Sequence, residues 1–154
     1  MAERLYLDSC VLNRPGDDQR QPRVRAESAA IAKILDIAVA GGVHWIASSV
    51  VELELKRNPR RERREDALLL LSLTSEFVHP TPASFQRAIA LRAEGYGDFD
   101  ALHLAVAELT KVDCLLTVDD RFLRRAGRRP NSPVPRVENP INWGRRRSPW
   151  LLNP

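Results

Sequence analysis

The chain has 154 residues, of which 44% are hydrophobic, enough for one domain whose core needs no disulfide or structural metal. No apolar run approaches the roughly 18 residues of a membrane span, and the N-terminus lacks the pattern of a signal peptide. We therefore expect a cytoplasmic protein without a membrane partner. Cys10, Cys114 and the three histidines lack the spacing of a zinc site or a redox pair.

The charge balance is mildly basic, with 24 basic residues, 20 acidic residues and a net charge of +4. Only Lys33, Lys56 and Lys111 are lysines, so 21 of the basic residues are arginines. Arginine binds phosphate through paired hydrogen bonds. A GC-rich coding sequence produces the same bias, so composition alone is weak evidence for a nucleic-acid partner.

Periodicity and turn residues divide the chain into alternating strands and helices. Strands are expected at 4–10, 43–47, 77–79, 112–118 and 134–137. Helices are expected at 26–40, 50–56, 65–75, 82–94, 98–108 and 121–126. A loop at 13–25 and a basic turn at 58–64 connect the first elements. This alternation predicts an α/β fold, with a mainly parallel central sheet covered by helices on both faces, over 1–143. The basic tail at 144–154 has no periodicity and is expected to be irregular.

Two carboxylates precede the apolar face of the helix at 98–108. Ala101, Leu104 and Ala105 recur at helical spacing, so Asp98 and Asp100 lie at the N-terminus of that helix. Negative charge is favoured there by the helix dipole. Considered alone, Asp98 is a helix cap and Asp100 merely suits the dipole.

Other carboxylates fall near the predicted carboxyl ends of strands. Asp8 interrupts the first strand, where burial of a carboxylate is costly unless it is paired or binds a cation. A salt bridge to an arginine is the structural alternative. Asp119 and Asp120 follow the strand at 112–118, and either can cap the next helix. The helix at 50–56 carries one inward and one outward carboxylate, and spacing alone does not decide which.

The carboxyl ends of parallel strands lie at one edge of a sheet, so these acids can converge in one cleft. Several carboxylates in one cleft repel one another unless a cation lies among them. Oxygen-only ligation favours Mg²⁺ or Mn²⁺, and such an ion suits phosphodiester hydrolysis. The sequence thus suggests a metal-dependent nuclease whose candidate ligands are Asp8, Glu54, Asp100 and Asp119. In the structural alternative, each acid is only a cap or a member of an ion pair.

Four segments, in the right order, resemble blocks of a known family. They read YLDSCVLNRP, SSVVELEL, DALHLAVAE and LLTVDDRFL. The chain resembles the PIN domain family, with its three-layer α/β/α fold, and within it the VapC-type toxin ribonucleases of type II toxin–antitoxin systems. The resemblance runs from Leu5 to about Trp143.

The resemblance implies a Mg²⁺- or Mn²⁺-dependent endoribonuclease. It assigns the inward carboxylate of the second segment to Glu54 and leaves Glu52 pointing outward. It gives Ser9 and Thr117 the role of positioning a water, a carboxylate or the phosphate. Asp98 and Asp120 are extra acids beside the expected ligands, and either could replace its neighbour.

The resemblance also implies partners: an RNA substrate, a small antitoxin protein whose tail enters the cleft, and a second copy in a homodimer. Candidate RNA contacts are Arg14, Arg121 and Arg124. The arginine-rich segment at 57–64 and the tail have no family role. A catalytically inactive or housekeeping PIN-like protein that binds or processes RNA is the alternative function.

Overall fold

The computed structural model describes residues 2–130 and 134–147. Its centre is a five-stranded sheet in the order β3-β2-β1-β4-β5, in which every neighbouring pair is parallel. The strands are β1 (Glu3–Leu7), β2 (Val43–Ser48), β3 (Glu76–Val78), β4 (Cys114–Leu116) and β5 (Arg136–Glu138). The predicted parallel α/β architecture is confirmed.

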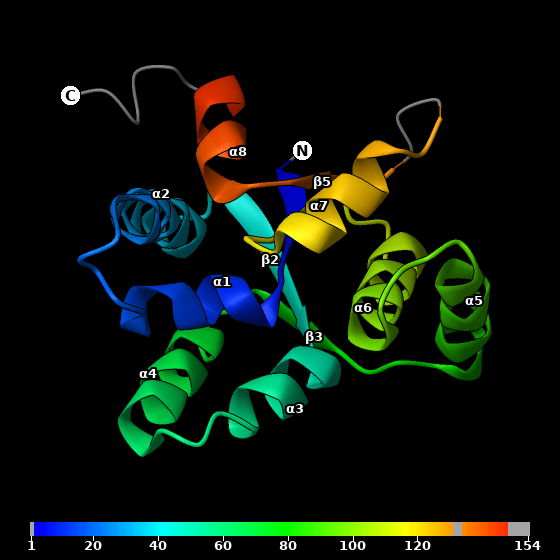
Figure 1. Cartoon of the computed structure of the whole chain (residues 1–154), viewed down its shortest axis with the longest axis horizontal. Coiled ribbons are helices and arrows are strands. Elements are labelled where there is room, and N and C mark those ends of the chain that lie inside the picture. Colours follow the sequence, from blue (N-terminus) through cyan, green and yellow to red (C-terminus); the bar gives the residue numbers. More distant parts are fainter. Residues whose placement is uncertain (1, 131–133, 148–154) are drawn as a thin grey trace.

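Helices cover both faces of the sheet, which makes three layers (Figure 1). Figure 1 shows α2 and α8 on one side of the sheet and α5 and α6 on the other. The α-helices are α1 (Ser9–Asn13), α2 (Pro22–Val39), α3 (Ser49–Lys56), α4 (Arg61–Leu71), α5 (Pro82–Ala93), α6 (Asp98–Leu109), α7 (Asp120–Gly127) and α8 (Pro140–Arg147), and a 3₁₀ turn, η1, spans Arg14–Gly16. Within the described ranges, no helix combines the length and apolar character needed to cross a bilayer.

The central strands are buried on both faces, which explains their continuous apolar runs. In β1, Leu5, Tyr6 and Leu7 are each at most 2% exposed. They pair with β2 on one side and β4 on the other. The chain leaves β1 through α2 toward β2 and leaves β4 through α7 toward β5, so the direction of winding reverses between β1 and β4. Ligands of open α/β sheets bind in the crevice at such a reversal.

The N-terminal elements differ from expectation in their boundaries. The first strand ends at Leu7 and α1 begins at Ser9, so Cys10 lies on a helix rather than in a strand. Val11 and Leu12 continue the apolar run because α1 buries them. Helix α2 begins at Pro22, four residues earlier than expected, with proline in the first turn, where its missing N–H removes no helical hydrogen bond.

Two basic segments expected to be irregular are helical. Arg61–Arg64 form the first turn of α4, and the tail forms helix α8 as far as Arg147, while 148–154 lie outside the described residues. The Asn139 side chain accepts a hydrogen bond from Ile141 N (2.9 Å) and so caps α8. Trp143 is fully buried, and its Nε1 donates to Glu3 Oε1 (3.1 Å). Helix α8 is therefore anchored to the core.

Because Trp143 is fully buried, we expect Trp143→Ala to destabilise the protein by about 3–5 kcal/mol in urea unfolding. Leu69→Ala is the control, since Leu69 is 70% exposed and its truncation should change stability by less than about 0.5 kcal/mol. Equal, small losses in both variants would show that α8 is not part of the core.

Candidate metal centre

Asp8 lies at the carboxyl end of β1, beside the winding reversal, and is only 4% exposed. Its backbone occupies the N-cap position of α1, but its side chain makes no capping hydrogen bond. Three neutral side chains donate to its carboxylate: Thr117 Oγ1 at 2.8 Å, Cys10 Sγ at 3.3 Å and Ser9 Oγ at 3.4 Å. No arginine or lysine of the described residues lies within ion-pair distance. The alternative of a salt bridge to arginine is therefore wrong.

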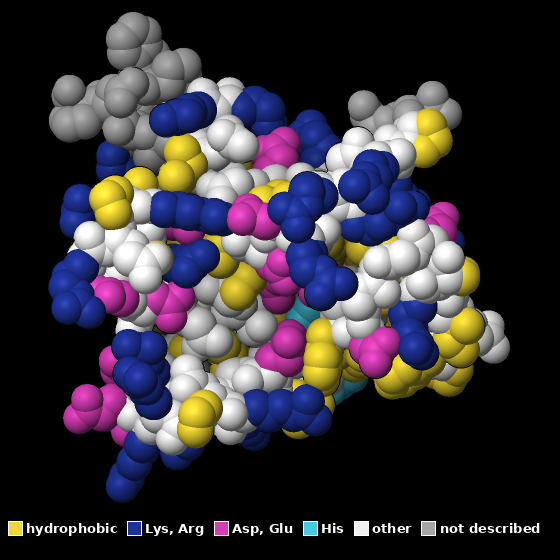
Figure 2. Space-filling view, viewed as in Figure 1, with side chains coloured by type: hydrophobic (Ala, Val, Ile, Leu, Met, Phe, Trp, Pro, Cys, Tyr) yellow, Lys and Arg dark blue, Asp and Glu magenta, His cyan; other side chains and the backbone are white. Residues whose placement is uncertain are grey.

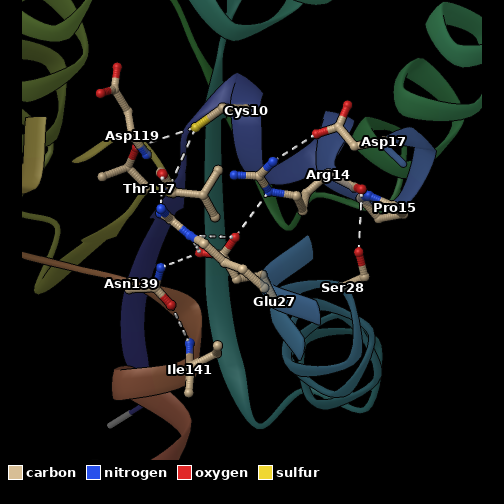
Figure 3. A network of polar contacts seen from close by, with 12 residues as sticks. Cys10, Arg14, Pro15, Asp17, Glu27, Ser28, Thr117, Asp119, Asn139 and Ile141 are labelled. Carbon is tan, nitrogen blue, oxygen red and sulfur yellow. Dashed lines mark hydrogen bonds and ion pairs between the residues drawn. The ribbon is translucent and has the colours of Figure 1, made fainter. Parts of the chain in front are cut away.

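Thr117, at the end of β4, joins Asp8 to the next acidic segment. It is fully buried, and its Oγ1, besides donating to Asp8, accepts a hydrogen bond from Asp119 N (3.1 Å). Cys10 Sγ lies 3.3 Å from the same hydroxyl. Figure 3 shows Cys10, Thr117 and Asp119 together. The positions of Asp8 and Asp119 are thus fixed relative to each other by one short side chain.

Glu54 is the inward carboxylate of α3. Its Oε1 accepts a hydrogen bond from Ser9 Oγ (3.1 Å) and contacts His103 Nε2. Glu52 instead pairs with Lys56 (3.3 Å), on the outer side of the same helix. The structure therefore gives Glu54 and Glu52 the orientations that the family resemblance implies.

His103, on α6, is fully buried and contacts both Asp8 and Glu54. Its Nδ1 lies 2.6 Å from Tyr6 Oη, which lies 2.7 Å from Ser48 Oγ. Burial by itself lowers the pKa of His103, but the hydrogen bond to Glu54 and the charges of Asp8, Glu54 and Asp100 outweigh it, so the net shift is upward. One ligand atom each of Asp8, Glu54 and His103 lies within 4.8 Å of the others. We interpret His103 as a hydrogen-bonding partner that orients Glu54.

Sequence reasoning missed His103, because its partners are distant along the chain. Tyr6 lies 97 residues away and Glu54 lies 49 residues away. The available signal was its position three residues after Asp100, on the same face of one helix.

Asp100, in the first turn of α6, lines one pocket together with Asp119 and is close enough to Asp8 and Glu54 to be affected by their charges. Its pKa is raised to about 7, first by burial and then by the charges of Asp8, Asp119 and Glu54, which outweigh the opposite effect of His103. The four acids come from four different parts of the chain. A bound cation would offset the repulsion that these neighbouring charges exert on Asp100, and carboxylate oxygens fit a divalent cation.

Asp119 both caps helix α7 and lines a pocket. Its Oδ1 accepts hydrogen bonds from Arg121 N (2.9 Å) and Phe122 N (3.4 Å), so it caps α7. It also lines, together with Asp100, a pocket of about 120 Å³. Figure 2 shows acidic side chains in a hollow near the centre of this face, with Lys and Arg side chains around it.

The two extra acids point elsewhere. Asp98 is 78% exposed and pairs with Arg92 (2.7 Å), and Gly97 rather than Asp98 occupies the N-cap of α6. Asp120 pairs with Arg23 (2.8 Å). The expectation that either could replace its neighbour in the cluster is not supported by these contacts.

The three arginines predicted to contact RNA lie in different surroundings. Arg121 lines the pocket beside Asp100 and Asp119, and Arg124 is exposed on α7. Arg14 is used internally, because its Nε lies 3.1 Å from Glu27 Oε1 and its Nη1 lies 3.1 Å from Asp17. Its side chain is 19% exposed, and an RNA contact at Arg14 stays a prediction.

Glu27, which sequence reasoning did not single out, is the buried centre of the network in Figure 3. It is 1% exposed and, besides Arg14, contacts Asn139 Nδ2 (2.5 Å) and Arg23 Nε (3.4 Å). Arg23 also binds Asp120 and the carbonyl of Val118 (3.1 Å). This network ties α2 to the segment that carries Thr117 and Asp119.

The fold and the acidic cluster at the winding reversal define an open α/β protein with a candidate ligand site in its crevice. Comparison with known proteins identifies its family. A sequence model of the PIN domain matches residues 5–128. The chain belongs to the PIN domain family, as the four segments indicated.

A structural relative is found in the crystal structure of VapBC2 from Rickettsia felis bound to a DNA fragment from its promoter. The TM-score is 0.58 at 15% sequence identity, and the match covers 88% of this chain and 98% of that one. At this identity the likeness establishes the fold. A comparison with curated proteins found no match.

The raised pKa of Asp100 predicts a pH-dependent stability in metal-free protein. The folded state holds the proton more tightly than the unfolded chain, so this stabilising contribution is lost as pH rises from about 4 to about 7. Asp100→Asn carries no charge, so it should be more stable than the parent protein at pH 8, by about 1–2 kcal/mol after allowance for screening by water.

Urea unfolding of the parent protein and of Asp100→Asn in EDTA, at several pH values between 4 and 8, measures this difference. Asp98→Asn is the control, because Asp98 is exposed and should show no comparable gain. A parent protein that gains stability relative to Asp100→Asn as pH rises would contradict the predicted repulsion.

Proposed function

We propose that the chain is a Mg²⁺- or Mn²⁺-dependent endoribonuclease that hydrolyses RNA phosphodiester bonds. What supports it most is the gathering of carboxylates at the winding reversal, where Asp8 and Glu54 belong to one candidate ligand group and Asp100 and Asp119 line one pocket. Membership of the PIN domain family agrees with a nuclease. Carboxylate oxygens suit Mg²⁺ and Mn²⁺ better than softer metals.

In this proposal the four carboxylates hold the ion, directly or through water. The bound metal would supply an activated water and neutralise charge developing on the phosphate. The remaining side chains position the ligands. His103 and Ser9 fix Glu54, and Thr117 fixes Asp8 through its hydroxyl. Arg121 lies beside the acids and is suited to bind the RNA backbone.

We further propose that the protein is the toxin of a toxin–antitoxin pair, inhibited by a small antitoxin and active as a homodimer. The support is the structural likeness to a chain of a VapBC complex. A catalytically inactive or housekeeping PIN-like protein that binds or processes RNA remains the alternative, and it predicts RNA binding without metal-dependent turnover.

The test of catalysis compares two glutamates of the same helix. Glu54→Gln should lower Mn²⁺-dependent cleavage of single-stranded RNA by about a hundredfold or more, because it removes a proposed ligand. Glu52→Gln should cleave at the parental rate, since Glu52 pairs outward with Lys56. Equal activity of the two variants would leave the proposed site without support.

Metal binding is tested separately from turnover. Mn²⁺ should raise the melting temperature of the parent protein by mass action, and much less that of Asp8→Asn. A parent protein that binds RNA but neither gains stability from Mn²⁺ nor cleaves RNA would favour the inactive alternative.

His103 provides a further test, because it orients Glu54 without being a proposed ligand. We expect His103→Gln to weaken Mn²⁺ binding about 10- to 100-fold in calorimetric titration. His44→Gln is the control, since His44 pairs with Glu76 (2.9 Å) at another part of the sheet. Unchanged Mn²⁺ affinity in a folded His103→Gln variant would contradict the orienting role.

A further inference from the structure

A small pocket adjoins the acidic cluster, between the turn that follows α5 and the first turns of α7. It is lined on one side by Asp100 and Asp119, and elsewhere by Tyr96, Arg121 and Arg125, together with Gly95, Gly97 and Phe122. Its volume is about 120 Å³. We call it the Tyr96–Arg125 pocket. Neither Tyr96 nor Arg125 has a role in the cluster described above.

Tyr96, which lines this pocket, carries an unpaired hydroxyl. The residue is 5% exposed, and its ring packs edge-on against Phe122 at a centroid distance of 5.9 Å. Its Oη is buried and has no hydrogen-bond partner among the described residues. Leaving such a group unpaired costs about 1–3 kcal/mol, so a tyrosine here is less favourable for the free protein than a phenylalanine. Burial, the largest influence, raises the pKa of Tyr96, so the hydroxyl keeps its proton and can donate it.

Arg125, which also lines the pocket, carries one unpaired buried guanidinium donor. Its Cζ lies 5.9 Å from the centre of the Tyr96 ring, and its buried Nε has no hydrogen-bond partner in the described ranges. Gly95 permits this placement: its φ is +107°, and a Cβ there would lie 3.4 Å from Arg125 Cδ and Nε. No carboxylate of the described residues, including Asp100 and Asp119, lies within ion-pair distance of the guanidinium.

Arg125 Nε can only donate, and the Tyr96 hydroxyl can also donate, so one acceptor group would satisfy both. An arginine fork beside a hydroxyl suits the oxygens of a phosphate. Free phosphate would be repelled by Asp100 and Asp119 unless these carboxylates hold a cation. A phosphate could accept hydrogen bonds from Arg125 and Tyr96 while its other oxygens face a cation held by Asp100 and Asp119.

We propose that the Tyr96–Arg125 pocket is a phosphate subsite, in which the Arg125 guanidinium and the Tyr96 hydroxyl bind a backbone phosphate of the RNA chain beside the metal centre. This inference rests on the proposed nuclease function and names two positioning residues for its substrate. The unpaired hydroxyl is retained at a cost to the free protein because the substrate supplies its acceptor.

The experiment measures binding of a fluorescent single-stranded RNA by anisotropy in Ca²⁺, an ion that also takes oxygen ligands. Arg125→Gln should weaken binding about tenfold or more, and Tyr96→Phe about two- to fivefold, as expected for loss of a charged and a neutral hydrogen bond. Arg128→Gln is the control, an exposed arginine at the C-terminus of α7 with the same charge change, and should weaken binding less than about twofold.

Steady-state cleavage and thermal unfolding give two further readouts. Both pocket variants should raise KM by the same factors with a smaller change in kcat. Tyr96→Phe should melt at or above the parental temperature, because it removes an unpaired buried hydroxyl. A merely structural role of that hydroxyl would instead lower the melting temperature.

The subsite would be refuted by equal losses of binding in Arg125→Gln and Arg128→Gln, or by parental binding in Arg125→Gln. It would also be refuted by a marked loss of stability in Tyr96→Phe. The results that refute the subsite differ from those that refute the proposed nuclease function. A parent protein that cuts no RNA, but whose binding falls with Arg125→Gln and Tyr96→Phe, would retain the subsite and lose the nuclease.

Discussion

Mutual repulsion among four carboxylates is the constraint on which the rest of this molecule depends. Asp8 is placed by the end of β1 and Asp119 by the end of β4, while α3 and α6 bring Glu54 and Asp100 to the same crevice. The pKa of Asp100 is raised first by burial and then by the neighbouring carboxylates, as expected for acids brought close together without a cation. A fold that only needed stability would separate these charges, so their proximity indicates a site maintained for a ligand rather than for packing.

Two buried polar networks hold the repelling groups in place. On one side, His103 bridges Glu54 and the Tyr6–Ser48 pair. On the other, Glu27 and Arg23 tie α2 to the chain that follows β4. Each network joins elements that are far apart in sequence. Such networks hold side chains in fixed positions because each contact is made in a region of low dielectric constant.

The sequence allowed the parallel architecture and the acids of the cluster to be predicted, because strand ends and helix starts are local features. Local sequence patterns did not show which side chains contact residues far away in the sequence. Arg14 was a candidate RNA contact, yet its guanidinium pairs with a buried glutamate 13 residues later in the chain. The segment after Asp8 is apolar enough to continue a strand, but α1 buries it instead. The tail was expected to be irregular, because the contact that anchors its helix joins Trp143 to Glu3, 140 residues away.

The short length of the two edge strands affects how this chain can bind other proteins. β3 and β5 are each three residues long, so each edge of the sheet presents very few free backbone donors and acceptors. A short edge is a poor template for an added strand. Recruitment of another polypeptide by sheet extension is therefore disfavoured, and association must depend on side-chain surfaces of the surrounding helices.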